Sequence, residues 1–241
     1  DSVAFKYIDN IIEKAKEHDL YVILDLHGTP GSQNGDEHSG IIGQGANFWH
    51  NQDYINSAVT FWEFVVDHYQ NVRPDLSATI ATYDILNEPT YTDKGITTKE
   101  CWKVFDLIYD SIRNKNDNHV ITIEGCWSFD GLPNPKDYKW ENVQYSYHLY
   151  NFNNSIVSYD LFYLYHDFHN MFRNYNVPVY IGEFTYFEDK DQWYRGFDIF
   201  EDRNYSWTVW NYKGCTVGWW STSWAVVTSK FNFNNEIEEK K

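Results

Sequence analysis

Two glutamates close short apolar runs in distant parts of the sequence. Glu88 ends the run Ala-Thr-Tyr-Asp-Ile-Leu-Asn-Glu, and Glu183 ends the run Val-Pro-Val-Tyr-Ile-Gly-Glu. Each run predicts a buried strand, and a carboxylate at the end of such a strand is held by rigid backbone while it faces an open rim. Pro89 disfavours helical geometry at Glu88, which predicts that the strand stops there. One such glutamate is more often a solvated strand end, but the pair suits acid/base and nucleophilic chemistry on a sugar.

The elements that must carry these glutamates alternate between strand and helix. Apolar faces with helical spacing predict helices at 3–17, 53–69, 98–114, 158–176 and 191–202. Near-continuous apolar runs predict six strands at 21–26, 79–87, 119–124, 143–149, 177–183 and 205–211. This alternation indicates a parallel sheet with right-handed crossovers. Polar side chains with possible functions close at least four strands, which favours a (β/α)8 barrel over a doubly wound sheet.

A complete barrel of this kind has eight strands, and only six are recognisable in the sequence. The helix at 3–17 opens the chain, which suggests that the other two strands lie before residue 1. The predicted fold is therefore an N-terminally truncated TIM barrel, in which residues 1–241 form a single catalytic domain.

Composition narrows the class of partner. The net charge of −16 argues against nucleic acid or an anionic membrane surface, because both are bound by Lys and Arg. No apolar run is long enough to cross a bilayer. Aromatic residues make up 20% of the chain, with 11 Trp and 20 Tyr, and such side chains offer flat faces to a neutral polysaccharide. Nothing in the sequence fixes the oligomeric state.

The cysteines do not suggest a metal site. The three of them, Cys101, Cys126 and Cys215, are widely spaced, which fits neither a zinc site nor a disulfide framework. We expect them to be small buried hydrophobic residues, and we expect no metal and no cofactor.

Five motifs, in order along the chain, carry a resemblance to a known family. They are Asp-Leu-His-Gly-Thr-Pro-Gly-Ser-Gln-Asn-Gly at 25–35, Leu-Asn-Glu-Pro at 86–89, Tyr-His-Leu-Tyr at 147–150, Ile-Gly-Glu-Phe at 181–184 and Ser-Trp-Thr-Val-Trp-Asn-Tyr-Lys at 206–213. From about residue 3 to 228 the chain resembles the family 5 glycoside hydrolases, which are retaining barrel enzymes that cleave β-linked sugars. The motifs look like the ends of that family's third, fourth, sixth, seventh and eighth strands.

The resemblance implies roles for the two glutamates. Glu183 would be the nucleophile that forms a glycosyl-enzyme intermediate, with hydrogen bonds from Tyr150 or Tyr147 to keep its pKa low. Glu88 would be the acid/base residue, which calls for a raised pKa. A retaining mechanism predicts that the two carboxyl groups lie about 5–5.5 Å apart.

The resemblance also implies residues that bind substrate. Asn87 would bind the sugar hydroxyl next to the cleaved bond, and Trp210 would stack on the sugar ring. His27, His148 and Tyr150 would bind hydroxyls or position the glutamates. Asp25 is expected to brace His27 or a backbone amide. Four other tryptophans could extend the cleft, although we favour core packing for each: Trp49, Trp127, Trp219 and Trp220.

Three functional classes were compared. A secreted retaining β-glucan hydrolase is favoured, acting on β-1,3- or β-1,4-linkages, with secretion inferred from where such polysaccharides lie. The alternative is a carbohydrate-binding protein without turnover. It is considered because two features of family members have no counterpart in this chain: the Arg on their second strand and the strand that begins the barrel. A flavin or nicotinamide enzyme lacks support, because no Gly-rich phosphate loop follows a strand.

Overall fold

The computed structural model describes residues 2–40, 43–90, 96–125, 131–150, 175–187, 189–215 and 227–229. The chain divides into two compact units. Unit 1 comprises Asp1–Ser146 and Tyr175–Pro178, and unit 2 comprises Tyr147–Asn174 and Val179–Lys241. The expectation of one catalytic domain over residues 1–241 stays a prediction.

Unit 1 is built on parallel strands that neighbour one another in sequence order. Strand β1 (Val22–Asp25) pairs with β2 (Ile80–Asp84), which pairs with β3 (Val120–Glu124). Strand β3 pairs in turn with the first half of β4 (Val143–Tyr150), which continues into unit 2. The same order continues through β5 and β6. Parallel pairing in register brings the carboxyl ends of β1, β2 and β3 to one edge of the sheet.

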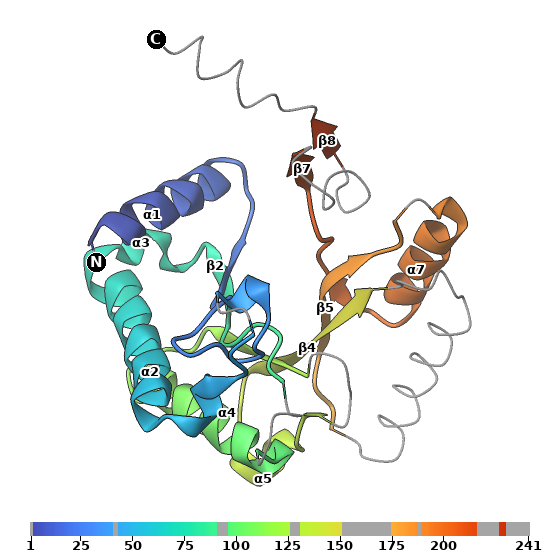
Figure 1. The fold of residues 1–241 in the computed structure, drawn as a ribbon. Helices are drawn as coiled ribbons and strands as arrows, with labels where there is room; N and C mark the ends of the chain where they lie inside the picture. The colour runs from blue at the N-terminus through green and yellow to red at the C-terminus, as the bar shows by residue number, and fades with distance from the viewer. Residues whose placement is uncertain are drawn as a thin grey trace, which may run out of the picture. The chain divides into compact units, whose positions relative to one another are not determined.

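Helices connect these strands and lie on one side of them in unit 1 (Figure 1). The long helices are α1 (Ser2–Glu17), α2 (Gln52–Asp67) and α4 (Thr98–Arg113). Helix α4 begins with a reciprocal capping box between Thr97 and Glu100, which satisfies two backbone N–H groups that a helix start leaves without partners. Shorter helical segments are the 3-10 turns Glu37–Ser39 and Asn47–His50, the π-helical turn His68–Val72, α3 (Pro74–Ser77) and α5 (Pro135–Tyr138).

The core of unit 1 lies between the strands and helices α2 and α4. Trp62, Tyr83 and Phe105 are fully buried there. The indole N–H of Trp62 donates to the carbonyl of Ile85 at 3.1 Å, so the largest side chain of α2 is hydrogen-bonded to the segment that follows β2. Burial of these aromatic surfaces is the main force that holds helices against the sheet.

Unit 2 contains β5 (Val179–Thr185), β6 (Ser206–Trp207) and α7 (Lys190–Asp202). Strands β5 and β6 are parallel, and Tyr180 lies opposite Ser206. Phe184 contacts the rings of Trp193, Phe200 and Trp207 with centroids 5.1–5.9 Å apart, which packs α7 onto the strands. A separate pair of short parallel strands is formed by β7 (Lys213–Cys215) and β8 (Val227–Ser229).

All six predicted strands are present, with different bounds. The second strand was expected at 79–87, but β2 ends at Asp84 because residues 85–88 depart from regular strand pairing. Two single hydrogen bonds continue beyond it, from the Ile85 N–H to the Thr122 carbonyl and from the Asn87 N–H to the Leu26 carbonyl. The last was expected at 205–211 but β6 covers only Ser206 and Trp207. Most of the helix predicted at 158–176 lies outside the described residues, and Tyr175 and Asn176 are not helical.

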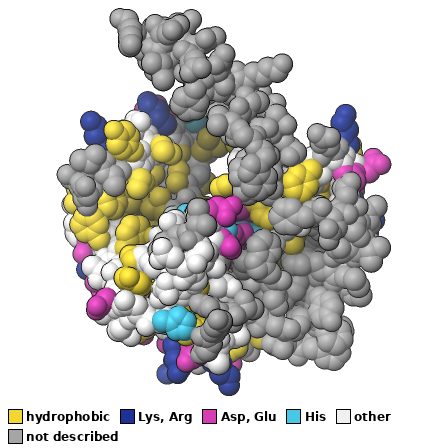
Figure 2. Space-filling view, viewed as in Figure 1, with side chains coloured by type: hydrophobic (Ala, Val, Ile, Leu, Met, Phe, Trp, Pro, Cys, Tyr) yellow, Lys and Arg dark blue, Asp and Glu magenta, His cyan; other side chains and the backbone are white. Residues whose placement is uncertain are grey.

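The predicted apolar face of α1 was partly wrong. Helical spacing predicts an apolar face that includes Tyr7, Ile11 and Ile12, but Tyr7 and Ile11 are 67% and 60% exposed. Ile12 is buried as expected, and Phe5, which was not part of the predicted face, is buried with it, because the Phe5 ring stacks on His68 beyond the end of α2. In the space-filling view, hydrophobic side chains gather on the side of unit 1 where α1 and α2 lie (Figure 2).

Among the described helices, none combines the length and the apolar character that crossing a membrane would require.

Candidate active site

A buried glutamine joins the ends of β1 and β2 in unit 1. The Gln33 side-chain amide nitrogen donates to the carbonyl of His27 at 2.9 Å and to the carbonyl of Asn87 at 2.8 Å. Its amide oxygen accepts from the backbone and the hydroxyl of Thr29, and the indole of Trp49 donates to its backbone carbonyl at 2.8 Å. One side chain therefore sets the spacing of the two strand ends that carry His27 and Asn87.

Contacts within unit 1 hold Glu88 through its N–H, its carbonyl and its carboxylate. Its N–H donates to Oε2 of Glu124, the last residue of β3, at 2.6 Å. Its carbonyl accepts from the Asn34 amide at 3.1 Å, and its carboxylate Oε2 lies 2.8 Å from Nε2 of His38. Its backbone has a φ of +42°, a region that costs a non-glycine residue about 1 kcal/mol or more. The surrounding contacts hold Glu88 in this conformation and keep its side chain only 10% exposed.

Asn87 precedes Glu88 and is buried. Its backbone N–H donates to the carbonyl of Leu26 at 3.1 Å. Among the described residues, its side-chain nitrogen Nδ2 has no hydrogen-bond partner. A buried amide donor without a protein partner is unfavourable unless a ligand or water accepts from it.

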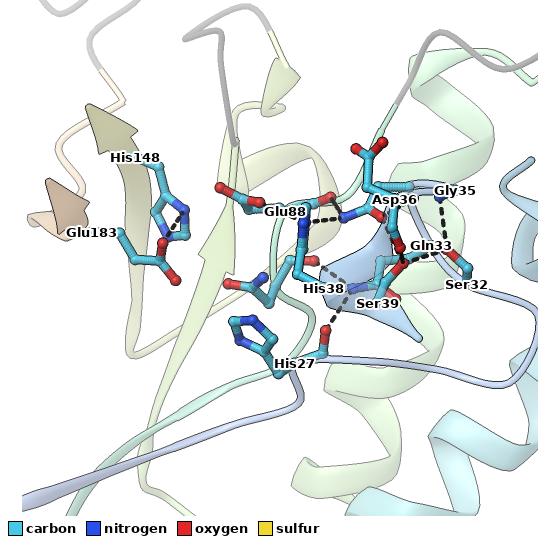
Figure 3. Close-up of polar contacts among 12 residues, drawn as sticks. His27, Ser32, Gln33, Gly35, Asp36, His38, Ser39, Glu88, His148 and Glu183 are labelled. Carbon is cyan, nitrogen blue, oxygen red and sulfur yellow. Dashed lines mark hydrogen bonds and ion pairs between the residues drawn. The ribbon is translucent and has the colours of Figure 1, made fainter. Parts of the chain in front are cut away.

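His27 follows β1 at the same edge. Its Nδ1 lies 2.8 Å from Oδ2 of Asp25, so the expected contact between these two residues is confirmed. Its ring centroid is 6.1 Å from that of His38, at an interplanar angle of 67°. Both imidazoles thus reach the rim of unit 1, and Figure 3 shows them with Glu88 and Gln33.

In unit 2 the second glutamate has different partners. Glu183 lies on β5, and its Oε2 accepts a hydrogen bond from the hydroxyl of Tyr150, the last residue of β4. Nδ1 of His148 lies 3.5 Å from the same oxygen (Figure 3). The side chains of His148 and Glu183 are 2% and 13% exposed. A phenol donor and a buried imidazole around one carboxylate oxygen favour the ionised form of Glu183.

Trp210 lies beyond β6 in the same unit. Its N–H donates to the carbonyl of Phe184 at 3.0 Å, which holds it next to the residue that follows Glu183. The side chain is 37% exposed, and the peptide bond to Asn211 is cis. A partly exposed indole at this place can offer a face to a sugar ring.

Trp49 and Cys101 lie in the core, as expected. Trp49 is buried, as favoured. Cys101 is buried and free, and burial raises the pKa of its thiol to about 12. Trp127, Trp219 and Trp220 lie outside the described residues.

Sequence reasoning did not assign roles to Gln33, Asn34, His38 or Glu124. Glu124 had a usable signal, because it closes the apolar run Val-Ile-Thr-Ile in the same way that Glu88 and Glu183 close theirs. Gln33 and Asn34 lie within the motif at 25–35, but the contacts of Asn34 and His38 depend on the path of the loop at 28–50, which no local pattern specifies.

Comparison with known proteins gives one family match and many relatives. The family described as Cellulase (glycosyl hydrolase family 5) matches residues 1–216. A protein named Beta-xylosidase from Phanerodontia chrysosporium is 33% identical over 148 residues, which are 61% of this chain and 29% of that protein. A probable glucan 1,3-beta-glucosidase A from Neosartorya fischeri is 29% identical over 191 residues, which are 75% of this chain and 42% of that protein. The chain thus spans less than half the length of these relatives.

Solved structures show the same fold. Thermotoga maritima Cel5A in complex with cellobiose has a TM-score of 0.69 at 18% identity, with 99% of this chain and 78% of that one covered. XacCel5A in complex with cellopentaose has a TM-score of 0.65 at 18% identity, with 95% of this chain and 75% of that one covered. These likenesses confirm the predicted α/β fold of the TIM-barrel type for the six parallel strands, and the match over residues 1–216 shows that the chain belongs to glycosyl hydrolase family 5.

Proposed function

We propose that this chain is the catalytic domain of a retaining β-glucan hydrolase. The observation that supports this most is the difference between the two strand-end glutamates. Glu183 has a tyrosine hydroxyl and an imidazole at one oxygen, which suits an ionised nucleophile. Glu88 is about as buried as Glu183, but its carboxylate contacts the imidazole of His38, which suits a group that gives up and takes back a proton. Two carboxyl groups in different environments are what divides acid and nucleophile roles in glycosidases.

Glu183 acts first as the nucleophile. Its carboxylate attacks the anomeric carbon, and a glycosyl-enzyme ester forms as the bond to the leaving sugar breaks. Glu88 gives its proton to the leaving oxygen, so the departing sugar leaves as an alcohol. Glu88 then takes a proton from water, the resulting hydroxide attacks the anomeric carbon, and Glu183 is released as a carboxylate. The two carboxyl groups are expected to lie about 5–5.5 Å apart in the working enzyme.

Other residues of the motifs bind the sugar. The Asn87 amide donates to the hydroxyl next to the cleaved bond, which gives its buried Nδ2 the acceptor that it lacks among the described residues. His27, His148 and Tyr150 bind hydroxyls or hold the glutamates, and Trp210 stacks on the ring. No metal or cofactor takes part in these steps.

The substrate is a neutral polysaccharide or oligosaccharide with β-1,3- or β-1,4-linked glucose. Curated relatives are named as glucan 1,3-beta-glucosidases, and solved structures with the same fold hold cellobiose or cellopentaose. Such polymers lie outside cells, so we propose that the enzyme acts there.

Within the same proposal, β1 to β6 correspond in order to the third to eighth strands of an eight-stranded barrel. Support comes from the parallel pairing in sequence order and from the places of the motifs, which close β1, β2, β4, β5 and β6 in turn.

The test is release of the aryl group from an aryl β-glucoside and of reducing sugar from laminarin and from carboxymethylcellulose. Glu183→Gln should lower both by at least about a thousandfold, because an amide cannot serve as the nucleophile. Glu201→Gln, an exposed change on α7, should leave them unchanged. Product stereochemistry measured by proton NMR should show retention. Binding of laminarin without turnover by the unchanged chain would support the carbohydrate-binding alternative instead.

A further inference from the structure

His38 reaches Glu88 from a loop that the motifs do not explain. It sits in the 3-10 turn Glu37–Ser39, and its Nε2 lies 2.8 Å from Oε2 of Glu88 (Figure 3). Hydrogen bonds among residues 32–39 hold this turn in place. The hydroxyls of Ser32 and Ser39 contact each other, the Ser39 hydroxyl oxygen lies 2.9 Å from the carbonyl oxygen of Asp36, and the Gly35 N–H donates to the Ser32 hydroxyl at 2.7 Å. These contacts therefore hold the His38 imidazole next to the Glu88 carboxyl group.

A second group faces the same ring nitrogen. The side-chain nitrogen of Asn34 lies 2.8 Å from Nε2 of His38. The orientation of this amide is set by its oxygen, which accepts from the Asp36 N–H at 3.0 Å and the Ser39 hydroxyl at 2.6 Å. Asn34 therefore points an N–H at Nε2.

These two neighbours favour opposite protonation states. An ionised Glu88 favours a proton on Nε2, because Nε2–H can then donate to the carboxylate. The Asn34 N–H favours a lone pair on Nε2, which leaves the proton on the Glu88 carboxyl group. Because Nε2 of His38 lies 2.8 Å from Oε2 of Glu88, the proton between them can sit on either group, and the pair loses protons as a coupled unit.

We propose that His38 is a positioning residue that shares the acid proton with Glu88 and so extends to higher pH the range over which Glu88 can protonate the departing sugar. This inference rests on the proposed function for its catalytic consequence. The contact itself is a property of unit 1 and can be measured without substrate.

The charged surroundings in unit 1 agree with a shared proton. The hydrogen bond to Glu88 raises the pKa of His38, burial opposes this, and the charges of Glu88 and Asp36 add to the increase while His27 lowers it. His27 is itself paired with Asp25 at 2.8 Å. As pH rises, a lone carboxyl group would lose its proton at its own pKa, but the coupled pair keeps one proton until the raised pKa of the imidazole is passed.

The first experiment compares pH profiles of kcat/KM on a poorly activated aryl β-glucoside. His38→Gln keeps a polar side chain but removes the titrating group. Its activity should be near that of the unchanged enzyme at about pH 5 and roughly tenfold lower at about pH 7, because the alkaline limb moves down by about one pH unit. The deficit should vanish on a dinitrophenyl glucoside, whose leaving group departs without a proton. His18→Gln, which alters an exposed histidine beyond α1, should leave the profile unchanged.

If His38→Gln lowered kcat/KM equally at all pH values, or left the pH profile unshifted, the proposed role of His38 would be overturned. Hydrolysis by the unchanged enzyme would still support the proposed function. Absence of hydrolysis at every pH would overturn the proposed function. The second measurement needs no turnover: NMR titration of the His38 ring, assigned by its loss in His38→Gln, in the unchanged protein and in Glu88→Gln. The pKa of His38 should fall in Glu88→Gln, and an unchanged pKa would overturn the shared proton.

Discussion

At the scale of single residues, Glu88 and Gln33 show how the residues after two strands form the rim of the candidate active site. Glu88 adopts a φ of +42°, although Pro89 was expected only to turn it away from helical geometry. The contacts of its backbone with Glu124 and Asn34 hold that conformation. Strain of this kind persists where the surroundings over-determine it, as they do at functional sites.

Gln33 offers a direct test of this rim. Gln33→Leu removes four hydrogen bonds and leaves the carbonyls of His27 and Asn87 buried without this donor. We expect the free energy of unfolding, measured by urea denaturation, to fall by roughly 3 kcal/mol, because unsatisfied buried polar groups cost about 1–3 kcal/mol each. Gln44→Leu, an exposed change in the same loop, should alter it by less than about 0.5 kcal/mol. Similar decreases in the free energy of unfolding for both variants would contradict the role of Gln33 in joining the ends of β1 and β2.

At the scale of elements, the connection between α4 and β3 carries the pair His119 and Asp117, which links this connection to neighbouring elements of unit 1. Nδ1 of His119 lies 2.7 Å from Oδ1 of Asp117, and its Nε2 lies 2.9 Å from the backbone carbonyl of Ser77 in α3. Both partners are acceptors, which favours hydrogen on both ring nitrogens and therefore the cationic imidazole. Tyr83 of β2 also contacts the pair, which joins three elements.

This cluster predicts a pH-dependent stability. Burial lowers the pKa of His119, but the hydrogen bonds to Asp117 and Ser77 outweigh it and the pKa is raised. A raised pKa in the folded state means that the stabilisation is complete below the unfolded value of about 6.5 and is lost as pH rises through the folded value. The stability difference between the unchanged protein and His119→Gln should therefore be largest near pH 5 and shrink towards pH 8 in urea denaturation. A stability difference that grows with pH would contradict the cationic form. His18→Gln is the control, and its stability difference from the unchanged protein should not vary with pH.

At the scale of the whole molecule, we expect the net charge to disfavour anionic substrates. The chain carries 35 Asp and Glu against 19 Lys and Arg, for a net charge of −16. A field of that sign repels anionic polymers and leaves neutral ones unaffected.

Salt should reveal this preference. At low substrate concentration, hydrolysis of anionic carboxymethylcellulose is expected to rise several-fold between about 0.01 and 0.3 M NaCl, because added salt shortens the screening length from about 30 Å to less than 10 Å. Hydrolysis of neutral laminarin should stay nearly constant over the same range and is the internal control. Equal responses of the two substrates would show that net charge plays no part.

Much of the fold was predictable because its signals are local. Apolar runs and helical spacing placed all six strands and the helices α1, α2, α4 and α7 to within a few residues in most cases. The errors arose where tertiary contacts decided. The stacking of Phe5 on His68 set which side of α1 is buried, and departure from ladder geometry ended β2 at Asp84.

The sequence by itself determined that Glu88 and Glu183 lie near the carboxyl ends of buried strands, because apolar runs and the proline after Glu88 are written in neighbouring residues. It also determined the family, through five motifs in order. Only the tertiary structure decided that Gln33 clamps two strand ends, that Glu124 holds the backbone of Glu88 and that His38 meets its carboxyl group. Those contacts join residues far apart in the chain, and their existence depends on the path of a loop that no local pattern specifies.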